Sequence, residues 1–221
     1  MDPRPLLLAH RGARRITPEN TLQAFDLALA HGCHGFEFDV RRTRDRELVI
    51  FHDAALKRKR VAATSFADLQ RRKPDLTTLA EVFRRFGKEA FLDIELKVAG
   101  TEREVIRLLT ADPPRRGYVV SSFIASVVQT VQQNCPQAQT GLICKSQAAL
   151  RRWRKMRTQM LIVHRRLVTA ALVNEAHERE QKILVWTVNR RSEMLRFARL
   201  GVDGIISDDT QRLCDVLGPR R

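Results

Sequence analysis

The sequence predicts an α/β protein built as a (β/α)₈ barrel, and three observations favour this fold class. Eight short apolar segments, each typical of a buried strand, alternate with segments of helical periodicity. The connections between them are short, as in the units that build parallel sheets. No glycine-rich dinucleotide loop follows the first strand, and no G-x-x-x-x-G-K-[ST] motif occurs. A barrel is therefore favoured over an open doubly wound sheet.

The first strand and the first helix follow from simple apolar patterns. Residues 6–9 read Leu-Leu-Leu-Ala, a short buried strand. Apolar residues then recur at spacings of three and four between Leu22 and Leu29, which places them on one face of a helix. Asn20 is interpreted as a cap of this helix rather than as a catalytic group, and Gly32 suits its end.

The second strand carries two acids. Within residues 35–40, Glu37 and Asp39 alternate with phenylalanine and valine, so both carboxylates lie on one side of the strand. We interpret this strand as buried on one face and directed at a site on the other. The alternative is an edge strand whose two acids face solvent. Neighbouring carboxylates repel each other unless a positive charge lies between them, and a divalent cation with oxygen ligands is the usual solution.

A short strand follows the second strand, and the chain then passes through two helices to the third. The expected elements are a strand at 48–51, a loop at 54–58, helices at 66–72 and 79–86, and a strand at 91–98. The short strand ends in His52-Asp53. In the third strand, Glu95 and Lys97 stand two residues apart and repeat the charged pattern of the second strand.

The second half of the chain repeats the strand and helix unit. Its apolar runs predict strands at 118–123, 140–144, 160–163, 183–188 and 204–207. Helical periodicity predicts helices at 102–109, 124–134, 147–156, 169–179 and 191–200, and a last helix ending at Leu217. Pro136 and Gly201 follow two of these helices, as expected where a helix stops.

Polar residues stand at the ends of nearly all these strands. In a barrel, the carboxyl ends of the strands open on one mouth, where such folds carry their chemistry. The residues expected there are His10, Arg11, Glu37, Asp39, His52, Glu95, Lys97, Ser122, Lys145, His164, Trp186 and Asn189. This convergence predicts an active site. Lys145 and His164 are more readily interpreted as solvated residues.

The composition restricts the partners. The net charge is +15, but the arginines are spread in pairs along the chain and only one Tyr and two Trp are present, which argues against a specific nucleic-acid site. Solvated helix faces in an arginine-rich sequence are the favoured explanation of the charge, and an anionic membrane surface and a phosphate-bearing substrate are the alternatives. Four cysteines without C-x-x-C spacing argue against a zinc ribbon. The N-terminal apolar run is too short for a signal peptide, so a cytoplasmic protein is expected.

Several short motifs occur in one order along nearly the whole chain. They are His10-Arg11-Gly12, Pro18-Glu19-Asn20-Thr21, Glu37-Phe38-Asp39-Val40, His52-Asp53 with Leu56 and Arg58, Glu95-Leu96-Lys97, Ser122-Phe123, Trp186-Thr187-Val188-Asn189 and residues 201–208. Together they resemble the glycerophosphodiester phosphodiesterase family. The resemblance implies one distorted (β/α)₈ barrel domain over residues 1–221, with a shortened insertion at 53–90. Arg46 stands where the family often has a turn glycine.

The resemblance also implies roles for individual residues. Glu37, Asp39 and Glu95 would bind one divalent cation, Mg²⁺ or Ca²⁺. His10 and His52 would be the general acid and base. Arg11 and Lys97 would contact the phosphate, Trp186 would form a wall of the substrate site, and Glu19 would lie near the metal and the histidines. Lys97 could instead merely neutralise Glu95, and Trp186 could belong to the core.

The implied function is metal-dependent hydrolysis of glycerophosphodiesters to sn-glycerol 3-phosphate and an alcohol. The alternative is a lysophospholipase D that acts at anionic membranes, with the basic helix at 150–156 docking on the surface. A non-enzymatic binding module is disfavoured, because both histidines and all three carboxylates are present. The preferred alcohol, the metal and the oligomeric state are left open.

Overall fold

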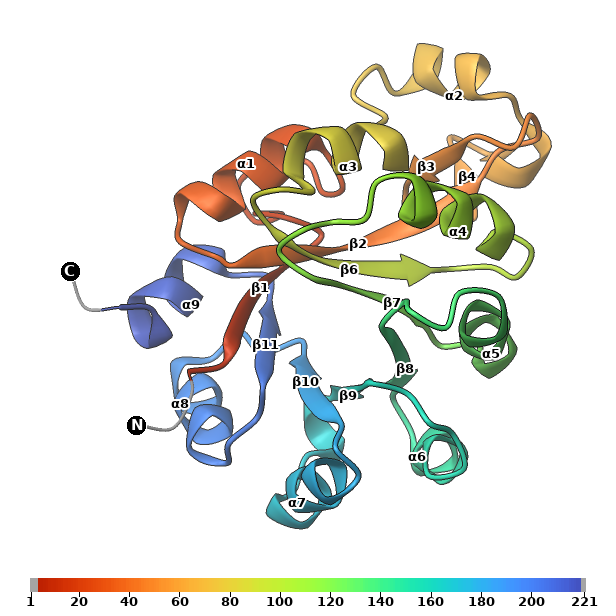
Figure 1. Ribbon diagram of the computed structural model, residues 1–221. Coiled ribbons are helices and arrows are strands. Elements are labelled where there is room, and N and C mark those ends of the chain that lie inside the picture. The colour runs from red at the N-terminus through yellow and green to blue at the C-terminus, as the bar shows by residue number, and fades with distance from the viewer. Residues whose placement is uncertain (1–3, 220–221) are drawn as a thin grey trace.

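The centre of the protein is a closed barrel of parallel strands (Figure 1). The computed structural model describes residues 4–219. In ring order the strands are β1 (Leu6–His10), β2 (Gly35–Arg42), β6 (Phe91–Leu96), β7 (Tyr118–Ser122), β8 (Thr140–Cys144), β9 (Met160–His164), β10 (Lys182–Trp186) and β11 (Gly204–Ser207). The ring closes because β1 pairs in parallel with both β2 and β11. The predicted (β/α)₈ barrel is confirmed.

Helices surround the barrel on its outside (Figure 1). They are α1 (Leu22–Ala30), α3 (Leu79–Phe86), α4 (Glu102–Ala111), α5 (Ala125–Asn134), α6 (Gln147–Trp153), α7 (Ala170–Glu178), α8 (Arg191–Arg199) and α9 (Thr210–Leu217). Several start at a side-chain cap, as Thr78 shows at α3: its hydroxyl accepts from the Glu81 N–H, and the Glu81 carboxylate accepts from the Thr78 N–H.

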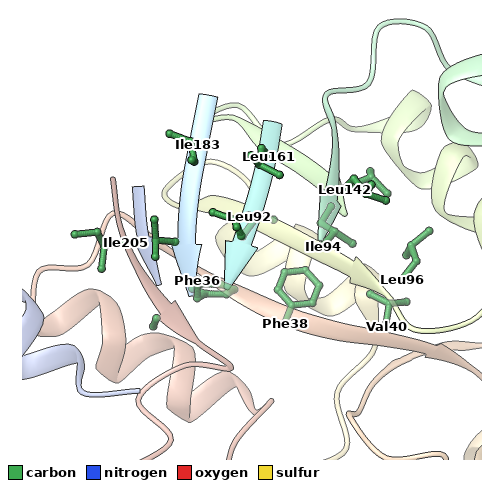
Figure 2. Close-up of a cluster of buried hydrophobic side chains, with 14 of the residues drawn as sticks. Phe36, Phe38, Val40, Leu92, Ile94, Leu96, Leu142, Leu161, Ile183 and Ile205 are labelled. Atoms are coloured by element: carbon green, nitrogen blue, oxygen red, sulfur yellow. The ribbon is translucent and has the colours of Figure 1, made fainter. Parts of the chain in front are cut away.

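The period of two along each strand divides the apolar residues into two cores. Phe36, Phe38 and Val40 of β2 point outward and pack with the helices in a cluster that continues around the sheet (Figure 2). The Phe25 ring of α1 stacks on Phe36 with ring centroids 4.1 Å apart. A second cluster fills the barrel interior from Leu8, Val119, Ile162, Leu184 and their neighbours. The outward cluster holds the helices in place, and the inward cluster closes the barrel beneath its mouth.

The region between β2 and β6 lies beside the mouth and departs from the prediction. It contains β3 (Leu48–Ile50), which pairs antiparallel with β2, then β4 (Ala55–Leu56), β5 (Lys59–Arg60), a 3₁₀ turn (Val61–Ala63) and α2 (Phe66–Arg72). The expectation of a loop at 54–58 is wrong, because β4 and β5 form a hairpin. Its turn residues Lys57 and Arg58 have φ of 45° and 67°, the left-handed conformations of a two-residue hairpin turn.

Some elements end earlier than their apolar patterns predict. β6 stops at Leu96, whose carbonyl accepts a hydrogen bond from the side-chain hydroxyl of Ser122 in the neighbouring strand β7. β10 stops at Trp186, and α6 stops at Trp153, beyond which tighter backbone bonds close the last turn. Arg46 adopts φ of 69°, a left-handed backbone conformation that glycine adopts more readily than other residues. This explains why the resembled family often has a turn glycine where this chain has Arg46.

Within residues 4–219, no helix combines the length and the apolar character needed to cross a bilayer. The expectation that the N-terminus carries no signal peptide rests partly on residues 1–3, which lie outside the described range.

Candidate active site

Two neighbouring strands place the acidic residues inside the barrel. In the parallel register of β2 and β6, Glu37 is paired with Asp93 and Asp39 with Glu95. Because the apolar residues of these strands point outward, the four acids point inward. Their exposed fractions are 4% for Glu37, 0% for Asp39, 1% for Asp93 and 7% for Glu95. β2 lies between β1 and β6, so the alternative of an edge strand with solvated acids is wrong.

Three of these acids form a group that could hold a metal ion. One oxygen each from Glu37, Asp39 and Glu95 lies within 4.8 Å of the others. Glu37 Oε1 is buried and has no hydrogen-bond partner in the described chain. Carboxylate oxygens are the ligands that hard divalent cations prefer, and an unpartnered buried oxygen needs a cation or a proton. The residues present therefore fit a divalent cation.

Two basic side chains border the acidic group. Lys97 Nζ lies 2.6 Å from Glu95 Oε1 and 3.1 Å from Asp39 Oδ1. On the other side, Arg11 Nε lies 3.1 Å from Asp39 Oδ2, and Arg11 Nη1 lies 2.9 Å from Glu19 Oε1. Lys97 therefore contacts two acids rather than Glu95 alone. Glu19 pairs with both Arg11 and Arg14.

Asn20 does not cap the first helix, contrary to the expectation. Thr21 is the N-cap, and its hydroxyl accepts from the Ala24 N–H. Asn20 is buried with φ of 58°, and its amide donates to Asp39 Oδ2 at 2.9 Å. The loop after β1 therefore delivers a hydrogen-bond donor to the floor of the site.

The charges in the site are unequally compensated. Burial acts to raise the pKa of Asp39, but the charges of Lys97 and Arg11 and the Asn20 hydrogen bond outweigh it, so this pKa is lowered. Burial and the neighbouring charges of Asp39 and Glu95 raise the pKa of Glu37 well above its ordinary value. Burial and Asp39 also raise the pKa of Glu95, although Lys97 opposes them. Negative charge thus exceeds positive charge around Glu37 and Glu95, which is the condition a bound dication would relieve.

His10 lies at the end of β1 between two carboxylates. Its Nδ1 is 2.7 Å from Asp208 Oδ1, and its Nε2 is 3.8 Å from Glu37 Oε2. Burial acts to raise the pKa of Asp208, but the hydrogen bond and charge of His10, the Asn189 amide and Arg14 lower it to about 2. Asp208 is therefore an acceptor at neutral pH, so the ring N–H at Nδ1 donates to it. This leaves Nε2 available for proton transfer.

His52 follows β3 and is more exposed. Its side chain is 36% exposed, and its Nδ1 lies 2.8 Å from Asp53 Oδ1. Arg41 Nε donates to the His52 carbonyl at 2.8 Å and fixes the backbone there. His10 and His52 therefore each have a carboxylate at Nδ1, and the more exposed pair, His52 and Asp53, lies at the rim of the mouth.

A cavity of about 410 Å³ joins these groups. Its lining residues are His10, Arg11, Glu37, His52, Asp93, Glu95, Lys97, Phe123, Ile143, Lys145, Ile162, Trp186 and Ile206. One half of the cavity is charged, and the other half is mainly apolar. In the apolar half, the Trp186 ring packs edge-on against Phe123 at 5.6 Å and against His164 at 5.2 Å.

Most of the residues expected at the mouth meet in this cavity, but four do not line it. Asp39 lies beneath the cavity, Ser122 bonds the Leu96 carbonyl, His164 stands behind Trp186, and Asn189 donates to Asp208. Sequence reasoning missed the contributions of Asp93 and Asp208. Asp93 alternates with apolar residues just as Glu95 does, and Asp208 directly follows the eighth strand, so both signals were present.

Comparison with known proteins shows which family the chain belongs to. A model of the glycerophosphoryl diester phosphodiesterase family matches residues 10–212. The chain belongs to this family. The resemblance drawn from the motifs and the predicted enzyme class, a phosphoric diester hydrolase, are thereby confirmed.

Individual relatives cover nearly the full chain. The glycerophosphodiester phosphodiesterase of Caldanaerobacter subterraneus subsp. tengcongensis is 29% identical over 96% of this chain and 97% of its own. A solved Oleispira antarctica phosphodiesterase, in complex with the product sn-glycerol-3-phosphate, is 26% identical with a TM-score of 0.83, and the match covers 98% of both chains. The glycerophosphodiester phosphodiesterase of Thermotoga maritima, with 24% identity and a TM-score of 0.83, shares the fold over 97% of this chain and 99% of its own.

Proposed function

We propose that this protein is a metal-dependent glycerophosphodiester phosphodiesterase that releases sn-glycerol 3-phosphate and an alcohol. One observation carries the proposal: three buried carboxylates have oxygens within 4.8 Å of one another, and two of them, Glu37 and Glu95, line a cavity with Arg11, Lys97 and two histidines. The solved Oleispira relative, which holds sn-glycerol-3-phosphate as its product, supports the choice of product. We further propose that residues 1–221 form one barrel domain, with residues 53–90 as a shortened insertion beside the mouth.

In this proposal, Glu37, Asp39 and Glu95 hold one Mg²⁺ or Ca²⁺. When bound, such a cation supplies positive charge that polarises a phosphoryl oxygen and favours the transition state. Arg11 and Lys97 border the same carboxylates, and in this proposal they contact the phosphate of the substrate. A phosphodiester carries a negative charge that repels a nucleophile, so these cations favour attack.

The two histidines divide the proton transfers. His10 offers Nε2 to the cavity because Asp208 occupies Nδ1, and His52 lines the cavity from the rim. One imidazole accepts the proton of the nucleophile, and the other protonates the departing alkoxide. The nucleophile is either water or the substrate's own glycerol hydroxyl. Trp186, which packs edge-on against Phe123 in the lining of the cavity, forms part of the wall against the glycerol or the leaving group.

Lysophospholipase D activity is the second candidate. Lys57, Arg58, Lys59 and Arg60 are all exposed on the hairpin beside the mouth. Lys57 Nζ donates to the Arg72 carbonyl at 3.0 Å, and within residues 4–219 no carboxylate oxygen lies within 4.0 Å of the charged nitrogens of the hairpin. Its uncompensated positive charge therefore favours an anionic surface. The helix at 150–156 does not support docking, because Leu150, Trp153 and Met156 are buried against the barrel.

A product assay distinguishes these candidates. Glycerophosphocholine and glycerophosphoethanolamine would be incubated with Mg²⁺, Ca²⁺ or EDTA, and glycerol 3-phosphate would be measured. Lysophosphatidylcholine would be tested in parallel through choline release. We expect metal-dependent release from the water-soluble diesters that EDTA abolishes. Choline release from the lysolipid alone would favour the second candidate, and equal rates with metal and EDTA would contradict metal dependence.

A further inference from the structure

Lys145 is the one ionisable side chain in the mainly apolar half of the active-site cavity, as far as residues 4–219 show. It follows β8 directly and lines the cavity together with Phe123, Ile143, Ile162 and Trp186. The acids that line the cavity all belong to the opposite, charged half. Lys145 therefore sets the sign of the charge that a ligand meets in the apolar half.

The ammonium group of Lys145 has no acidic partner to neutralise it. Within the described chain, no carboxylate oxygen lies within 4.0 Å of Lys145 Nζ, in contrast to Lys97, which contacts Asp39 and Glu95. The side chain lies over the Phe123 ring, with Nζ 5.3 Å from the ring centroid. This cation–π contact holds the ammonium group at the cavity wall without cancelling its charge.

The position of Lys145 relative to Lys97 relates it to the substrate. Lys97 Nζ lies 5.8 Å from the same Phe123 centroid, so the two ammonium groups are within about 11 Å of each other, the sum of the two distances. If the phosphate sits beside Lys97, a small alcohol esterified to it can extend past Phe123 to Lys145.

We propose that Lys145 selects the alcohol of the substrate, so that the enzyme prefers glycerophosphodiesters whose second alcohol carries a negatively charged group. This inference rests on the proposed function. A cationic alcohol such as choline brings like charges together in the apolar half of the cavity, whereas an anionic alcohol gains a charge-assisted contact there. Asp53, the exposed acid that pairs with His52, does not line the cavity.

Three diesters test the proposal. Glycerophosphocholine has a cationic alcohol, glycerophosphoglycerol a neutral one, and the terminal phosphate monoester of glycerophosphoglycerol an anionic one. The last two differ only in the added phosphate. Loss of each diester would be followed by its ³¹P NMR signal in the presence of Mg²⁺ or Ca²⁺. We expect kcat/KM to rise in the order cationic, neutral, anionic.

Two substitutions of Lys145 then assign the preference. Lys145 is exposed, and exposed charge pairs are weak, so Lys145→Met should reduce the anionic-to-cationic ratio of kcat/KM about threefold to fivefold. Lys145→Glu should reduce this ratio by roughly tenfold or more, because attraction becomes repulsion. Added salt should weaken the wild-type preference. Lys155→Glu changes the net charge equally at an exposed position outside the cavity and should leave the ratio unchanged.

Other outcomes would contradict either the role of Lys145 or the proposed function. Equal kcat/KM for the three diesters in the wild type, or an unchanged ratio in Lys145→Glu, would overturn the selection by Lys145 while leaving the proposed function standing. A wild type that hydrolyses none of the diesters with either metal would overturn the proposed function, and this inference with it.

Discussion

His10 has a carboxylate near each ring nitrogen, but only Asp208 is close enough to hold the ring. The Asp208 contact at Nδ1 is 2.7 Å, whereas Glu37 lies 3.8 Å from Nε2. Asp208 is itself held by the Asn189 amide at 2.7 Å. In the proposed mechanism Nε2 of His10 transfers the proton, and a ring held in one tautomer by Asp208 keeps this nitrogen free for that step, which is a common role of a carboxylate beside a catalytic histidine.

Asp208→Asn tests this positioning role. The amide keeps the size of the side chain but removes the charge that fixes the His10 tautomer. We expect kcat for diester hydrolysis to fall by about tenfold to 100-fold, with a small change in KM. Asp203→Asn is the matched control, because Asp203 also pairs with a histidine, His177, at 2.8 Å but before β11 rather than after it. Similar losses of kcat in both variants would contradict the positioning role.

Asp93 is a buried acid that the proposed chemistry does not use. It accepts a hydrogen bond from Ser121 Oγ at 2.6 Å, and its Oδ2 has no partner within the described chain. Burial raises its pKa to about 7, and the charges of Glu95 and Asp39 act in the same direction, against the Ser121 hydrogen bond. The folded protein therefore binds this proton more tightly than the unfolded chain, where the pKa of Asp is about 3.9.

This difference predicts a pH-dependent stability. The contribution of Asp93 is fully present below about pH 4 and is lost as the pH rises to about 7. The amide side chain introduced by Asp93→Asn cannot lose a proton, so the variant does not lose this stability as the pH rises. The free energy of unfolding of Asp93→Asn minus that of the wild type should therefore increase by on the order of 3 kcal/mol between pH 4 and pH 8. Urea unfolding in EDTA at several pH values would measure this gain. A constant difference between the two proteins across this range would contradict it.

Among the elements, β2 shows how much of the site can be predicted from the sequence pattern. Alternation of acids with phenylalanine and valine predicted a strand with one buried apolar face and one functional face. The structure has Phe36 and Phe38 in the outer core, while Glu37 and Asp39 lie inside the barrel. A period of two is a local property of the backbone, so it survives whatever the strand pairs with.

Other features of the elements depend on distant residues and escaped prediction. Asn20 is a residue type that often caps helices, but Asp39 comes within hydrogen-bond distance of its side chain only once β1 and β2 are paired. The hairpin turn at Lys57-Arg58 lacks the Asn-Gly signal of its type. β6 ends where Ser122 of the next strand takes the Leu96 carbonyl. For Asn20 and for the end of β6, a contact with a distant part of the chain decides between the local alternatives.

The barrel as an assembled unit explains why residues far apart in sequence meet. Closure of β1 onto β11 brings Asp208 to His10, a separation of 198 residues. The sequence predicted that strand ends would share one mouth, but it could not show which side chains touch there. The fold also pairs some of the arginines with acids, as it does for Arg14, Arg15 and Arg154, whereas the hairpin at Lys57–Arg60 and Lys145 are among the basic residues without such a partner in the described chain.

The most direct test of the proposed chemistry is turnover of a glycerophosphodiester by two variants, Glu37→Ala and His52→Ala, at saturating Mg²⁺ or Ca²⁺. Glu178→Ala and His177→Ala are the controls, because both residues are exposed on or near the end of α7, away from the cavity. We predict that both site variants keep the circular dichroism of the folded protein and lose at least about 100-fold in kcat, while the controls keep theirs. Near-normal turnover in either folded site variant would contradict the assignment of metal site and catalytic histidine.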